Sequence, residues 1–236
     1  MFYELYYIPF YLENVKDFSP TITGVALMPL TGALLPTSII IGRIMTKTGR
    51  FRWAVWVGWA VIIAGTGLLI LLDVHTRTYA WVLIFVVVGL DHGFILMSLN
   101  FSIQAMTETH NVAYAAAMYT LTRTFEMCIG VAADGAMFQN QLKKHLSDLA
   151  LLTTVATDAE GFVAKLQTLP KSSSEYQKYV LAYAKSFENV FKVLTAVAGL
   201  TRLLNLLTKH FSMDKKLDSE HVLRQGKKEK SALESS

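Results

Sequence analysis

The sequence predicts an all-α membrane protein built as a bundle of six transmembrane helices. First, 53% of its 236 residues are hydrophobic and 17% are charged, whereas a soluble domain has about 25% charged residues. Second, the apolar residues gather in segments of about 20 residues, the length that crosses a bilayer. Third, the basic residues concentrate in one short loop and in the C-terminal tail, as is typical of membrane proteins. The net charge of +4 therefore does not indicate nucleic-acid binding.

The first two predicted spans are separated by a polar turn. Residues 2–14 form an aromatic, apolar segment that is short for a hydrocarbon core of about 30 Å. Ser19 and Pro20 suit the cap and first position of a helix, so a second span is expected at 20–45. Prolines at positions 29 and 36 are expected to bend it.

Four further spans follow. The third, 53–72, begins with tryptophans that suit a membrane interface. The fourth, 81–103, and the fifth, 112–139, are apolar segments that each contain ionisable residues. The sixth is expected at 186–208.

The remaining segments are polar. Residues 1–139 hold the first five spans, and 140–185 are expected to be an extracytoplasmic, mainly solvated loop with amphipathic patches. Residues 209–236 form a basic tail. With six spans, this tail and the basic loop at 43–52 lie on the same side, which the positive-inside rule makes cytoplasmic.

Several classes of function lack sequence support. The single cysteine, Cys128, excludes an intrachain disulfide and a cysteine-cluster metal site. We find no nucleophile motif, phosphate-binding loop or metal-ligand spacing. The sequence therefore predicts a non-enzymatic protein without a cofactor or metal.

A charged stripe crosses the fifth span. Spacings of four, three, four and four residues place its members on one helical face. They are Tyr119, Arg123, Glu126, Gly130 and Asp134. In a membrane helix such a stripe must face protein or a water-filled cavity, so its charged members are candidates for substrate or proton binding. Alternatively, Arg123 and Glu126 only neutralise each other as an ion pair.

Asp91 and His92 lie inside the fourth span and are a second candidate proton site. Neighbouring helical residues point about 100° apart, so the two are not expected to face the same spot. Alternatively, one faces a cavity while the other bonds a backbone carbonyl.

Tyr7 belongs to an aromatic face of the first span, together with Phe10 and Tyr11. This face is a candidate pocket wall for a hydrophobic ligand. The alternative is a packing stripe, which is the commoner role of aromatic runs.

Four stretches carry a resemblance to a known family: YYIPFYLENVKDFSPTITGVALMPL, GRIMTKTGRFR, TRTFEMCIGVAADGAMFQNQL, and the long loop before a last span and the tail HFSMDKKLDSEH. With these four stretches in this order, the chain resembles the major facilitator superfamily. Within it, the chain resembles the fungal fourteen-spanner drug:proton antiporters, a group that includes toxin efflux pumps. The resemblance implies that the chain corresponds to the C-terminal six-helix bundle, without the N-terminal bundle.

The resemblance also implies roles for particular residues. The second stretch stands in the place of the family's cytoplasmic gate motif, with Thr46 and Lys47 where the motif has Asp-Arg. The candidate gate residues are Gly42, Arg43, Gly49 and Arg50. Arg123 matches a family position, whereas Glu126 and Asp134 stand where the family favours small residues.

The implied function is proton-coupled efflux of a hydrophobic small molecule, such as a drug or fungal toxin, across the plasma membrane. The expected partners are the lipid bilayer, protons, the small-molecule substrate, and an N-terminal transporter half or a second copy. No nucleic-acid partner is expected. The alternative is a truncated, transport-inactive membrane fragment or assembly partner.

Overall fold

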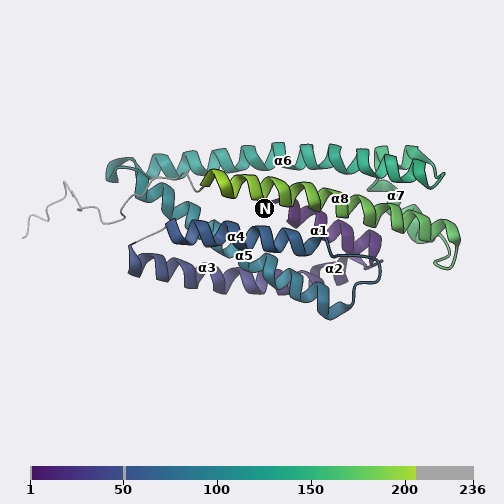
Figure 1. Cartoon of the computed structure of the whole chain (residues 1–236), viewed down its shortest axis with the longest axis horizontal. Helices are drawn as coiled ribbons and strands as arrows, with labels where there is room; N and C mark the ends of the chain where they lie inside the picture. Colours follow the sequence, from purple (N-terminus) through teal and green to yellow (C-terminus); the bar gives the residue numbers. More distant parts are fainter. Residues whose placement is uncertain (1, 50–51, 206–236) are drawn as a thin grey trace, which may run out of the picture.

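The computed structural model describes residues 2–49 and 52–205, and within these ranges the secondary structure is helical (Figure 1). The helices run roughly along the long axis of the molecule. They are α1 (Phe2–Val15), α2 (Pro20–Ala26), α3 (Met28–Thr48), α4 (Arg52–Leu69), α5 (Thr78–Met106), α6 (Val112–Asp148), α7 (Gly161–Thr168) and α8 (Ser174–Asn205). Two short 3-10 turns are η1 (Thr109–Asn111) and η2 (Thr153–Asp158).

Within the described residues, each apolar segment that the sequence indicates is helical over most of its length. By length and composition, two stretches of the described chain could cross a membrane: Pro20–Thr48, which covers α2 and α3, and Thr78–Gln104 in α5. The apolar part of α4, Trp53–Leu69, is shorter. The count of six spans therefore stays a prediction. The tail at 209–236 lies outside the described residues.

The second apolar segment starts as predicted but is divided into two helices. The Ser19 hydroxyl accepts a hydrogen bond from the Ile22 amide, and Pro20 occupies the first turn of α2. The helix then breaks at Leu27, two residues before Pro29. Proline lacks an amide hydrogen and clashes with the carbonyl four residues earlier, which explains a break at this point.

Helix α5 is the centre of the packing and contacts α3 and α4 more extensively than any other described pair of helices. Glycines allow α3 to approach closely, because a Cβ at Gly93 would lie 2.7 Å from the Cβ of Thr37. Helix α8 packs against α4, α6 and α1. Helix α1 begins near the middle of the long axis (Figure 1), and its Glu4 side chain is buried.

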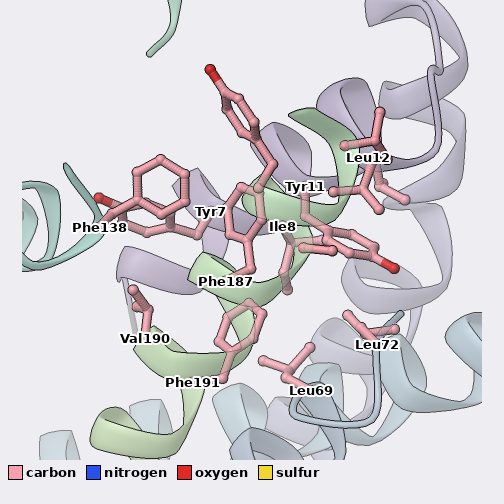
Figure 2. Close-up of a cluster of buried hydrophobic side chains, with 14 of the residues drawn as sticks. Tyr7, Ile8, Tyr11, Leu12, Leu69, Leu72, Phe138, Phe187, Val190 and Phe191 are labelled. Atoms are coloured by element: carbon pink, nitrogen blue, oxygen red, sulfur yellow. The ribbon is translucent and has the colours of Figure 1, made fainter. Parts of the chain in front are cut away.

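An aromatic cluster joins α1, α6 and α8 (Figure 2). Phe138 and Phe187 lie at its centre, with ring centroids 4.7 Å apart. Tyr7 packs against both and is only 2% exposed. Tyr7 therefore packs in this cluster.

Residues 140–185, which we call the cap, are largely helical. Helix α6 continues to Asp148 and α8 begins at Ser174, with η2 and α7 between them. The expectation of a mainly solvated loop is wrong, because several apolar side chains of the cap join the main core; they are Val155, Ala156, Ala159 and Leu166. The Tyr183 hydroxyl donates a hydrogen bond of 2.7 Å to the Ala159 carbonyl. The side of the membrane on which the cap lies stays a prediction.

The cap contains a histidine whose burial predicts a pH effect. The His145 ring nitrogen Nε2 lies 3.1 Å from the side-chain nitrogen Nδ2 of Asn189, so α6 and α8 meet there. Burial lowers the pKa of His145 below its ordinary value. Because the unfolded state then binds more protons, folding stability should fall as the pH drops from about 7.5 to about 5.5.

We expect His145→Gln to reduce this pH dependence in unfolding measurements on the purified chain. His75→Gln, at an exposed histidine in the turn after α4, should leave it unchanged. An equal pH dependence in the wild type and His145→Gln would contradict this account.

Candidate functional site

Part of the charged stripe of α6 lines a cavity of about 260 Å³. Tyr119, Arg123 and Glu126 lie on its wall. Most of the opposing wall is apolar and comes from α4, α5 and α8; it includes Trp59, Ile62, Leu99 and Val197. The arrangement is an apolar hollow with a few polar groups on one side, which is the usual composition of a small-molecule site.

Asp134 does not share this wall, although it lies on the same stripe. Its side chain is buried, with 8% exposure. It precedes Gly135, where a Cβ would lie 3.7 Å from the Tyr7 hydroxyl oxygen. A second cavity of about 310 Å³ lies here, and Tyr7, Phe10 and Gly135 are among its lining residues. Asp134 is therefore separated from the stripe residues that line the first cavity, and it lines neither of the two cavities.

Asp91 and His92 are buried in α5, with 1% and 0% exposure. Their side chains converge, because the Asp91 Oδ1 atom lies 2.5 Å from the His92 Nδ1 atom. The expectation that these neighbours face different spots is wrong: their Cβ atoms diverge, but the rotations of the two side chains bring their tips together. The alternative is confirmed in part, since His92 Nδ1 also lies 2.7 Å from the Val88 carbonyl oxygen.

Glu4 completes this cluster and was not singled out by the sequence analysis. Its Oε2 atom lies 3.0 Å from His92 Nε2, and the residue is 1% exposed. The available signal was a carboxylate near the start of the aromatic, apolar first segment, among aromatic residues. An ionisable residue in such a helix needs a buried partner. We call Glu4, Asp91 and His92 the α1–α5 cluster.

The α1–α5 cluster is also the candidate cation site among the described residues. One ligand atom from each residue lies within 4.8 Å of the others. However, the two ring nitrogens of His92 face two different carboxylates. This geometry suits a chain of shared protons better than a single ion held between three ligands, because a metal ion binds one nitrogen of a histidine.

Of the candidate gate residues, Gly42, Arg43 and Gly49 lie in the last turns of α3 or directly after it. Gly42 and the exposed Arg43 line an open cavity with Thr46, Lys47 and Phe101. Gly49 ends α3 with a φ of 62°, a left-handed conformation that favours glycine. Arg50 lies outside the described residues.

Comparison with known proteins identifies the family. The sequence model of the Major Facilitator Superfamily matches residues 1–131. The chain is 34% identical to MFS transporter L2 of Phoma sp. (strain ATCC 20986 / MF5453), over 97% of this chain and 39% of that protein. It is 30% identical to the MFS-type transporter pydD of Acremonium sp, over 98% of this chain and 41% of that protein. It is 28% identical to the MFS-type efflux pump LUC4 of a Fusarium species, over 99% of this chain and 43% of that protein.

The described chain is a helical bundle in which two stretches are long and apolar enough to cross a membrane. The chain belongs to the Major Facilitator Superfamily, which confirms the resemblance seen in the sequence. These relatives are named as transporters or pumps, in agreement with the prediction of a non-enzymatic protein. The chain spans about two fifths of the length of these relatives.

The close approach of α4 to the α1–α5 cluster gives a stability prediction. A Cβ at Gly65 would overlap the Oδ2 atom of Asp91, whereas a Cβ at Gly67 would meet Thr195 at an ordinary 3.9 Å. We expect Gly65→Ala to reduce the free energy of unfolding by about 1–3 kcal/mol. Gly67→Ala should be neutral or stabilising, because alanine favours helix formation.

Unfolding of both variants in detergent, by titration with a denaturing surfactant, measures the difference. Equal stabilities would show that α4 does not constrain the position of Asp91.

Proposed function

We propose that this chain forms one bundle of an alternating-access transporter that exports a hydrophobic small molecule, driven by proton entry. The observation that carries the proposal is the cavity in which Arg123 and Glu126 stand on an otherwise largely apolar wall. Family membership supports membrane transport. Among the relatives, aclA of Aspergillus oryzae is named an MFS efflux transporter and FUS6 of Gibberella moniliformis an efflux pump.

The size and composition of the cavity fit this role. Ligand pockets are commonly about 300–1,000 Å³ and largely apolar, with a few polar groups that set orientation. A cavity of about 260 Å³ in one bundle is slightly smaller. In transporters built from two bundles, the substrate site lies at their interface. A second bundle, either an N-terminal transporter half or a second copy of this chain, would enlarge and close the site.

Several ionisable residues are available to carry protons in this proposal. Glu126 lies on the cavity wall, while Asp134, Asp91 and His92 are buried. Ionisable groups inside a membrane protein commonly mark proton pathways. In the same proposal, the chain has six spans in the plasma membrane, the cap at 140–185 is extracytoplasmic and the tail at 209–236 is cytoplasmic.

The cavity makes a direct prediction about transport. Val197→Trp would fill the cavity from α8, and Arg123→Gln would remove its cationic group. We expect each change to reduce proton-driven export of a hydrophobic dye at least about tenfold, equivalent to about 1.4 kcal/mol of lost transition-state or binding free energy. Dye export from vesicles with an imposed pH gradient measures this, with the chain expressed alone and with an N-terminal bundle.

Two matched substitutions control for expression and folding. Val193 is exposed one turn before Val197, and Thr122 is exposed beside Arg123; neither lines the cavity. Val193→Trp and Thr122→Ala should therefore transport like the wild type. Normal export by both cavity variants would overturn the assignment of this cavity to the substrate.

A further inference from the structure

His92 joins two helices through two carboxylates. On one side its Nδ1 atom lies 2.5 Å from Asp91 Oδ1, within α5. On the other side its Nε2 atom lies 3.0 Å from Glu4 Oε2, which belongs to α1. All three residues are at most 1% exposed. Water therefore does not stabilise charges on this cluster in the conformation described.

The contacts of His92 fix where one hydrogen lies. Nδ1 faces two acceptors, the Asp91 carboxylate and the Val88 carbonyl oxygen at 2.7 Å. Nδ1 must therefore carry a hydrogen, because a bare nitrogen would face two oxygens without a proton between them. The neutral ring then has a bare Nε2, and only the imidazolium has a hydrogen there as well.

This assignment requires a second proton in the contact between Glu4 and His92. Either Nε2 carries it and donates to the Glu4 carboxylate, or Glu4 is a carboxylic acid that donates to Nε2. Without that proton, two lone pairs would face each other at 3.0 Å in an apolar interior. The contact between α1 and α5 is therefore compatible with the protonated state alone.

Groups from other parts of the chain also face the α1–α5 cluster. The charge of the N-terminal amino group acts on Asp91. Asp91 Oδ2 is buried without a hydrogen-bond partner. Among the described residues, the α4 group that faces Asp91 is Gly65, which does not ionise, and α3 approaches this part of α5 through Leu34 and Thr37.

We propose that Glu4 and His92 form a proton-binding link between α1 and α5, in which one bound proton holds the helices together and its release to water separates them. The proton leaves Nε2 or the Glu4 carboxyl for a water molecule, leaving a neutral imidazole and a carboxylate that no longer bond. This inference rests on the proposed function, because it supplies the step by which proton entry would move a helix of the transporter. It adds Glu4 as the residue that makes the proton-dependent contact.

Electron paramagnetic resonance on the full 236-residue chain in lipid nanodiscs tests the link. Spin labels are placed beside the two ends of the link, at Tyr6→Cys on α1 and Leu90→Cys on α5, in a Cys128→Ser background. The distance between the labels is measured across pH. We expect the wild-type labels to move apart as the pH rises. Glu4→Gln should keep the short distance at every pH, because its amide donates to a bare Nε2 without a titratable proton.

Glu175→Gln changes an exposed acid on α8 and should retain the pH-dependent movement. A wild-type distance independent of pH, or a pH-dependent movement that persists in Glu4→Gln, would overturn the proposal. The measurement needs no substrate and no transport. Loss of export with an intact pH-dependent movement would therefore contradict the proposed function and leave the link standing.

Discussion

The contact of His92 with Glu4 is the interaction on which the position of α1 against α5 depends. Charged groups inside an apolar bundle must be paired, and removing one member of a buried pair typically costs about 3–5 kcal/mol. The other end of α1 is held differently. There, Lys16 donates to the carbonyl oxygens of Val74 and Thr76, and the Tyr11 hydroxyl donates to the Asp73 carbonyl. Helix α1 is thus fixed at its C-terminal end by bonds to backbone carbonyls and at its buried end by an ionisable contact.

Helix α5 connects this contact to the cavity. His92, Ile95 and Leu99 follow one another at helical spacing, and the latter two line the cavity that contains Arg123. The proton-dependent contact and the cavity wall therefore share one helix, about one turn apart. In a transporter, such proximity would let a proton on His92 or Glu4 bias a helix that also forms the substrate site. This gives the proposed proton coupling a physical route that does not require the charged stripe of α6.

The sequence predicted the local structure better than the contacts between helices. Composition predicted an all-α fold, and Ser19 and Pro20 predicted the start of α2, because capping depends on adjacent residues. Helical spacing placed Arg123 and Glu126 on one face, and both line the cavity. The same spacing placed Asp134 with them, but periodicity describes a face of one helix and not which neighbour packs against each part of it.

Side-chain contacts between residues that are distant in the sequence could not be predicted from composition and spacing. Glu4 and His92 are far apart in the sequence, and their contact depends on how α1 packs in the bundle. The convergence of Asp91 and His92 depends on side-chain rotations that backbone geometry does not fix. The buried side chains of the cap, such as Val155 and Leu166, are separated by polar residues, so their low local hydrophobicity concealed a packed core.

The protonation state of His92 tests the central claim most directly. Solid-state nitrogen NMR of histidine-labelled protein in bilayers distinguishes protonated from bare ring nitrogens, and a His92→Gln spectrum assigns the signal. The account predicts a hydrogen on Nδ1 at every pH and an Nε2 signal that changes with pH in the wild type but not in Glu4→Gln. A bare Nδ1, or an Nε2 signal that Glu4→Gln leaves unaltered, would contradict it.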